Sequence, residues 1–320
     1  MTRFIKLIIA ASCIFSLIVF PIACGGDDAA EQKATVKKAE PKPAVKHETK
    51  AEVKPEVKHE VTPAVKHEAE KPVAKKKAKP SPDKAIEMLK AGNARFVDGI
   101  PNHPHINRAR LIQAGKENQG DHAYATVITC SDSRVPVELV FDAGVMDIFV
   151  IRVAGNVCDT DEVGSIEYGL AHVNTPVLVV LGHTQCGAVT AVTHAVLGTG
   201  HALERNIPPL VDNIQPAVKL AMSKQADVKG DAIVPYAIEE NVWQGIDDLF
   251  MASPASRELV KSGKAKVVGA IYDVGAGIVN WLPEDKTMDI LKKVEANPDR
   301  AMNAMAGGGD AEEAGGGGHH

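Results

Sequence analysis

Four short apolar runs rich in Val and Ile constrain most strongly how this 320-residue chain can fold. They lie at residues 124–129, 148–153, 177–181 and 266–272. Each run has the length and composition of a strand that is buried on both faces. Helical patterns alternate with them, at 162–172, 187–197 and over much of 206–261. This alternation predicts an α/β fold with a mainly parallel central sheet flanked by helices.

The folded domain is predicted to span residues 81–299. Ser81, Pro82 and Asp83 form a typical helix start, with a hydroxyl N-cap, Pro at the first helical position and an acid in the first turn. Residues 24–80 are dominated by Ala, Glu, Lys and Pro, repeat the motif AVKHE and contain no aromatic residue. Such a segment cannot bury a core, so we expect a disordered spacer there and a disordered Gly-rich tail over 300–320.

Residues 1–23 have the pattern of a signal peptide, with Arg3 and Lys6 before an apolar run and small residues before Cys24. The sequence Cys24-Gly25-Gly26 resembles the lipobox of bacterial lipoproteins and predicts lipidation of Cys24. We therefore expect an exported, periplasmic protein that is lipid-anchored to a membrane. Free export and a retained membrane helix over 7–23 are the alternatives. All three place the rest of the chain outside the cytoplasm.

Nucleic acid is not an expected partner. The formal net charge is −5 and aromatic residues make up 4% of the chain. The chain therefore has neither the basic surface nor the aromatic stacking platforms that nucleic-acid binding favours.

Two of the apolar runs lead into residues that bind metals. Cys130 follows the first run, and the sequence GHTQC with His183 and Cys186 follows the third. Ligand sites in parallel sheets form at the carboxyl ends of the strands, so these side chains are expected to meet. Two thiolates and an imidazole suit zinc and leave a fourth position open, as in catalytic zinc sites. A Cys130–Cys186 disulfide is the alternative in an exported protein.

Asp132 and Arg134 alternate with Cys130 along an extended segment, which places all three on one side. Zinc lowers the pKa of a bound water towards about 7, so that hydroxide forms at neutral pH. The Asp132 carboxylate is predicted to orient that hydroxide, and the Arg134 guanidinium to hold the carboxylate. A phosphatase loop is excluded because an acid between the Cys and the Arg would repel phosphate.

The motifs CSDSR at 130–134 and HTQCG at 183–187 resemble those of the β-class carbonic anhydrases. Further similar segments follow in the family order, namely LKAGNARFVDG at 89–99, ELVFDAG at 138–144, FVIRVAGN at 149–156, GSIEYGL at 164–170, VVLGHTQCGAV at 179–189 and YDVGAGIVNWL at 272–282. The resemblance covers roughly residues 81–283. It implies one zinc ion per subunit on Cys130, His183 and Cys186. It also implies reversible hydration of carbon dioxide to bicarbonate and a proton by zinc-bound hydroxide.

The resemblance further implies a homodimer, or a higher even oligomer, with the substrate pocket near the subunit interface. Matched residue by residue, the pocket would contain Val135, Phe141, Tyr168 and the backbone amide of Gly187. The chain departs from many members at Asp121, where they have Gln. Members with a bicarbonate-operated switch carry Trp where this chain has Val127, which argues against that switch here, although Arg152 matches another of its components.

Two other functions stay open at this stage. One is hydrolysis of carbon disulfide or carbonyl sulfide on the same zinc site, and the other is a catalytically silent binding module. Cys158 is expected to be a free thiol and not a metal ligand. His122, His172 and His194 are the candidates for transferring the product proton to solvent.

Overall fold

The computed structural model describes residues 78–305, which belong to one compact unit. The predicted signal peptide, Cys24, nearly all of the spacer and most of the Gly-rich tail lie outside the described residues. No helix within residues 78–305 has the length and apolar character needed to cross a membrane.

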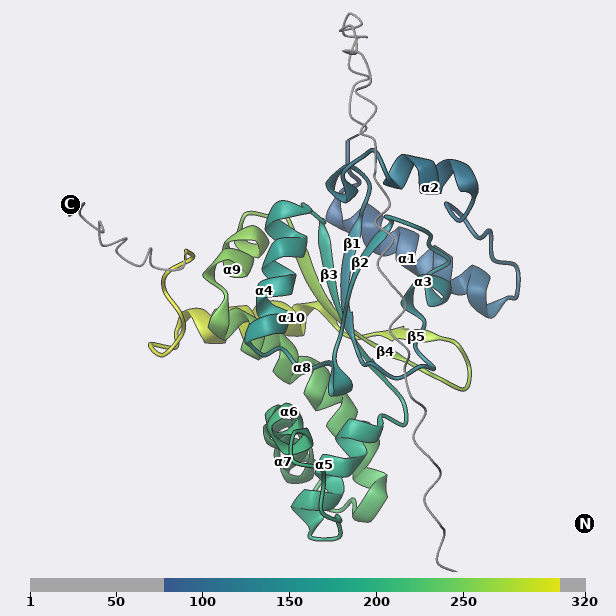
Figure 1. Cartoon of the computed structure of the whole chain (residues 1–320). Coiled ribbons are helices and arrows are strands. Elements are labelled where there is room, and N and C mark those ends of the chain that lie inside the picture. Colours follow the sequence, from purple (N-terminus) through teal and green to yellow (C-terminus); the bar gives the residue numbers. More distant parts are fainter. Residues whose placement is uncertain (1–77, 306–320) are drawn as a thin grey trace, which may run out of the picture. The chain divides into compact units, whose positions relative to one another are not determined.

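A five-stranded sheet with the order β2-β1-β3-β4-β5 forms the centre of the unit (Figure 1). Its strands are β1 (Ala125–Thr129), β2 (Ile148–Arg152), β3 (Val177–His183), β4 (Lys266–Tyr272) and β5 (Val279–Trp281). The first four are mutually parallel, and β5 is antiparallel to β4. The prediction of an α/β fold with a mainly parallel sheet is therefore confirmed.

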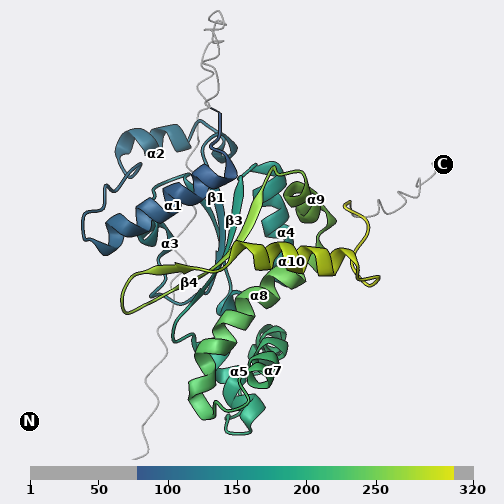
Figure 2. The ribbon, with the colours of Figure 1, turned by 180° about the vertical axis from the view of Figure 1, so that it is seen from behind.

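Helices cover both faces of the sheet, as the two opposite views show (Figures 1 and 2). One core cluster joins α1 (Pro82–Val97) and α3 (Val137–Val140) to one face. A second joins α4 (Thr160–Glu167), α8 (Val234–Ala252), α9 (Pro254–Lys261) and α10 (Glu284–Glu295) to the other. A third cluster lies among α5 (Gly187–Leu197), α6 (Ile207–Val211), α7 (Gln215–Lys224) and the start of α8. The short helix α2 (Arg108–Ala114) follows α1.

Local signals account for several boundaries. The Ser81 side chain accepts a hydrogen bond from the Lys84 amide and caps α1, which begins at Pro82 as predicted. α5 and β4 have the predicted bounds, and β3 runs two residues further than predicted, to His183. The predicted helix over 162–172 is α4 followed by a π-helical turn over Tyr168–His172.

α1 packs closely on the end of α3 because Gly92 faces it. A Cβ atom at Gly92 would lie 1.9 Å from the carbonyl oxygen of Phe141. Any larger residue would therefore force the two segments apart, and glycine is what allows this contact.

Candidate metal centre

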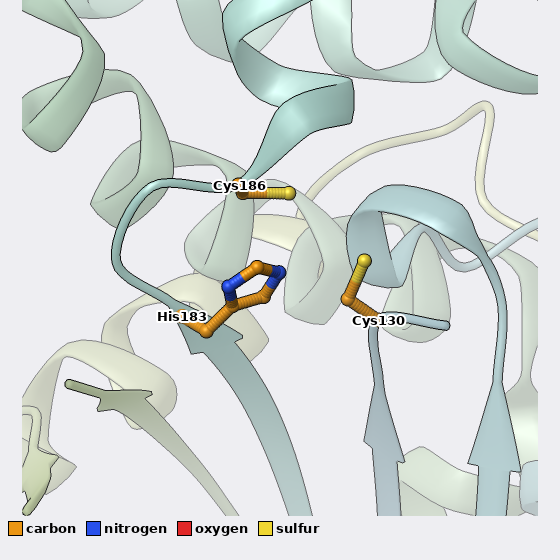
Figure 3. A group of neighbouring side chains, drawn as sticks. All are labelled: Cys130, His183 and Cys186. Carbon is orange, nitrogen blue, oxygen red and sulfur yellow. The ribbon is translucent and has the colours of Figure 1, made fainter. Parts of the chain in front are cut away.

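Three metal-binding side chains meet at the carboxyl ends of β1 and β3 (Figure 3). Cys130 follows β1, His183 is the last residue of β3, and Cys186 is the N-cap of α5. Their donor atoms all lie within 4.8 Å of one another, and all three residues are buried. The structure thus brings together the three residues that the sequence predicts to meet.

The His183 ring has its Nε2 atom free to bind a metal. Nδ1 lies 2.9 Å from the carbonyl oxygen of Thr184, which can only accept, so Nδ1 carries the proton. Nε2 is then an acceptor, and it is buried with no hydrogen-bond partner. Leaving a buried polar atom unpaired costs free energy, and a metal ion bound there would remove that cost.

Hydrogen bonds surround the two thiols. The Gly155 N–H donates to Cys130 Sγ at 3.3 Å. The Cys186 thiol, as hydrogen-bond donor, lowers the pKa of Cys130, and the hydrogen bond to Cys130 together with burial raises the pKa of Cys186. Two thiolates within 4.8 Å of each other would repel unless a cation lay between them, and Cys2His is a ligand set that suits zinc.

Asp132 and Arg134 form a two-point ion pair beside the thiols. Arg134 Nε donates to Asp132 Oδ1 at 3.0 Å, and Nη2 donates to Oδ2 at 2.7 Å. These bonds hold the pKa of Asp132 well below its usual range. Asp132 Oδ2 lies 4.0 Å from His183 Nε2, so the ionised carboxylate faces the metal centre.

The Asp132–Arg134 pair also contacts the loop between His183 and Cys186. Arg134 Nη2 also donates to the Gln185 carbonyl oxygen at 3.0 Å, and Nη1 donates to its side-chain oxygen at 3.2 Å. Gln185 has a left-handed backbone with a φ of 57°. The Arg134 contacts help to hold this unfavourable conformation, because non-glycine residues rarely adopt it unaided.

Arg152, the last residue of β2, holds the other side of the Cys130 segment. Its Nε donates to the Cys130 carbonyl oxygen at 3.2 Å, and its Nη2 donates to that of Asp132 at 2.6 Å. The sequence resemblance matches Arg152 only to a component of the bicarbonate-operated switch. In the structure two of its nitrogens bind backbone carbonyls of the segment that carries Cys130 and Asp132.

The residues that the resemblance assigns to the pocket lie in different places. Val135 and Phe141 are fully buried in the core on the α1 side of the sheet. Gly187 is exposed at the first position of α5, with open space where a side chain would be. Tyr168 is 50% exposed.

Tyr168 does not lie beside the metal centre of its own chain. Its ring packs at 5.9 Å from that of Phe149, which pairs in the sheet with Thr126. Thr126 precedes Cys130 by four residues, about 13 Å along a strand at about 3.3 Å per residue. Asp121 lies in a short 3₁₀ turn before β1, also towards the amino end of that strand. Phe149 carries no local sequence signal of a role, and its ring contact with Tyr168 is visible only in the folded chain.

The remaining predicted residues have other contacts. His122 lies near Arg110 and Glu117, His172 stacks on Tyr168, and His194 pairs with Asp231. Cys158 is a free, buried thiol whose pKa burial raises, as expected for a thiol that binds no metal. Cys130 and Cys186 are likewise free thiols, so the alternative disulfide is not formed.

Comparison with known proteins identifies the family. The family model described as carbonic anhydrase matches residues 125–279. The chain is 37% identical to the carbonic anhydrase of Mycolicibacterium smegmatis over 202 residues, covering 62% of this chain and 92% of that one. It is 34% identical to carbonic anhydrase 2 of Mycobacterium tuberculosis, covering 62% of this chain and 91% of that one.

Solved β-carbonic anhydrases also resemble it. CcaA is 25% identical with a TM-score of 0.48, over 61% of this chain and 86% of that one. CafA of Aspergillus fumigatus is 24% identical with a TM-score of 0.49, over 66% and 97%. On the strength of its sequence relatives, this chain belongs to the carbonic anhydrase family.

Proposed function

We propose that the chain catalyses the reversible hydration of carbon dioxide to bicarbonate and a proton, with zinc held by Cys130, His183 and Cys186. The observation that carries this proposal is the buried cluster of three donors, in which His183 Nε2 has no partner. Three protein ligands with an open fourth position are typical of catalytic zinc, whereas structural zinc usually has four.

Zinc bound there would act as a Lewis acid that makes a water-derived nucleophile available near neutral pH. The chain's own residues set the conditions for that chemistry. The Thr184 carbonyl fixes the His183 tautomer so that Nε2 is unprotonated. The first-turn amides of α5, including those of Ala188 and Val189, face the Cys186 sulfur and stabilise its negative charge.

Asp132 is suited to orient the nucleophile. Arg134 keeps the Asp132 carboxylate ionised, so the carboxylate can only accept a hydrogen bond. It would therefore accept a hydrogen bond from the attacking oxygen, which leaves a lone pair of that oxygen directed at carbon. The exposed Gly187 amide at the start of α5 is a donor for a substrate oxygen, because the first amides of a helix have no partner within it.

We propose further that the active unit is a homodimer or a higher even oligomer. The exposed Tyr168, packed on Phe149, lies towards the amino end of β1, away from its own metal centre. Tyr168 could reach a pocket beside zinc only if a second copy supplied it. Light scattering of the purified chain tests this, and a monomeric active enzyme would contradict it.

For localisation we propose export through the signal peptide over residues 1–23 and lipidation of Cys24, which would hold the enzyme at a membrane in the periplasm. The N-terminal charge and hydropathy pattern supports this. Labelled palmitate should be incorporated into the wild-type chain and not into Cys24→Ser. Equal labelling of the two chains would contradict it.

Stopped-flow carbon dioxide hydration by the purified, zinc-loaded chain at about pH 8.5 tests the reaction, because the nucleophile is then fully formed. Cys186→Ser removes a ligand, and Cys158→Ser is the matched control because Cys158 is buried but lies outside the donor cluster. We expect fast hydration that is lost only in Cys186→Ser. A folded, zinc-loaded chain that hydrates no carbon dioxide but hydrolyses carbon disulfide or carbonyl sulfide would overturn the proposal.

A further inference from the structure

Asn241 is a polar residue on the buried face of α8. It is 3% exposed. The buried residues around it on this helix are mostly apolar, namely Val234, Ala237, Ile238, Val242, Gly245, Ile246 and Leu249. A side-chain amide costs free energy to bury unless it is hydrogen-bonded, so its partner indicates what the residue does.

That partner belongs to the loop that supports the metal centre. Asn241 Nδ2 donates to the Gly155 carbonyl oxygen at 2.7 Å, across 86 positions of sequence. The N–H of the same glycine donates to Cys130 Sγ at 3.3 Å. A single residue therefore separates the Asn241 amide from a metal-binding sulfur.

The backbone of this loop is left-handed at two consecutive residues, and the second of them is not glycine, so contacts from outside the loop help to hold it. Gly155 and Asn156 are consecutive left-handed residues, with φ values of 78° and 45°. Left-handed backbone is readily adopted by glycine and costs other residues free energy. A Cβ atom at Gly155 would also lie 2.5 Å from Ile214 Cδ1, so no larger residue fits there without movement.

We propose that Asn241 is a positioning residue for the metal centre. It fixes Gly155 so that the Gly155 N–H stays directed at the Cys130 sulfur. The inference rests on the proposed zinc site. Partners in the shell around metal ligands typically change metal affinity about 10- to 100-fold when they are removed, and we expect an effect in that range.

Asn241→Ala tests the proposal, with Asn93→Ala as the matched control. Asn93 is also a buried asparagine, and it donates to the carbonyl oxygens of Val140 and Gly277 at 3.1 and 2.8 Å. It lies in α1 and is not part of the donor cluster. Both variants lose hydrogen bonds from a buried amide, but only Asn241→Ala should lower the zinc affinity.

The measurements are zinc affinity by competition with a chromophoric chelator, and the visible spectrum of the cobalt-substituted full chain. We expect zinc affinity about 10- to 100-fold weaker and an altered cobalt–thiolate spectrum in Asn241→Ala. Asn93→Ala should match the wild type in both, although its melting temperature falls. If Asn241→Ala does not fold, Asn241→Leu, which fills a similar volume but has no donor for the Gly155 carbonyl oxygen, decides the same measurements.

Zinc affinity within twofold of the wild type, with an unchanged cobalt spectrum, would overturn the proposal. So would equal weakening in Asn93→Ala, because the effect would then be general destabilisation. A wild-type chain that binds neither zinc nor cobalt would overturn the proposed function itself. If the wild type and the Asn241 variant bind zinc equally well, only the positioning role of Asn241 is overturned.

Discussion

The buried negative charge of Asp248 in α8 lowers the free energy of unfolding, and replacement of Asp248 by Asn should remove this effect. Burial raises the pKa of Asp248 from the usual 3.8 to about 6, with smaller contributions from the nearby acids Asp247 and Asp159. Gln244 Nε2 donates to Asp248 Oδ1 at 2.6 Å, which offsets part of the cost of burying the charge. In Asp248→Asn the side chain keeps its shape and can still pair with Gln244, but it has no charge to bury.

The size and the sign of the effect follow from this pKa. Well below pH 4 the carboxyl is protonated in the folded and unfolded chains alike, so it does not change the free energy of unfolding. Above about pH 6 it is ionised in both, and the folded chain bears the full cost. A difference of about 2 pKa units corresponds to about 3 kcal/mol. Because the group is partly solvated, we expect Asp248→Asn to stabilise the chain by about 2 kcal/mol at pH 8, or roughly 4–8 °C in melting temperature.

Urea unfolding of the wild type and Asp248→Asn at about pH 4.5, 6 and 8 measures this difference, which should grow across the range as the wild-type carboxyl ionises. Asp247→Asn is the control, because that neighbour pairs with Lys293 at 3.1 Å and its loss should cost at most about 1 kcal/mol. A gain of the same size at all three pH values, or no gain at pH 8, would refute the reasoning that burial of the charge raises this pKa.

Three further predictions concern the site and its support. Asp132→Asn should slow carbon dioxide hydration about 10²- to 10⁴-fold in stopped flow while one zinc per chain is retained, and loss of the zinc would contradict the orienting role. Gly92→Ala should destabilise the chain by about 2 kcal/mol or more in urea unfolding, because its Cβ would lie 1.9 Å from the Phe141 carbonyl oxygen. Gly164→Ala in α4, where that atom meets nothing within 4 Å, should gain up to about 1 kcal/mol, and equal effects would count against the packing argument. After chelation of the metal, iodoacetamide at about pH 6 should modify Cys130, whose pKa the hydrogen bond from Cys186 lowers, and leave Cys158, whose pKa burial raises. Peptide mass spectrometry would show the order, and prior modification of Cys158 would contradict it.

Much of the metal centre could be predicted because its signals are local in sequence. An apolar run followed by Cys130, and another followed by His183, is enough to bring the two residues together once the strands are parallel neighbours, as β1 and β3 are. The start of α1 at Pro82 and the end of α5 before the left-handed Gly198 also follow from residues at those positions.

Other features depend on contacts between distant segments and have no local signal. β5 has three residues and is a strand because it pairs antiparallel with β4, so no pattern within it predicts it. The strand order β2-β1-β3-β4-β5 depends on which apolar faces pack together. Asn241 looks like an ordinary polar residue in a helix until α8 is placed against the loop at Gly155.

The sequence by itself determined the strand–helix alternation and the chemistry of the three metal-binding donors and of the Asp132–Arg134 pair, because composition and spacing act over a few residues. Only the tertiary structure decided that Arg152 and Asn241 hold the segments around Cys130, and that Tyr168 lies away from the metal centre of its own chain. A hydrogen bond between residues 86 positions apart forms only after packing has brought the Asn241 side-chain amide within 2.7 Å of the Gly155 carbonyl oxygen, and no local pattern records that approach.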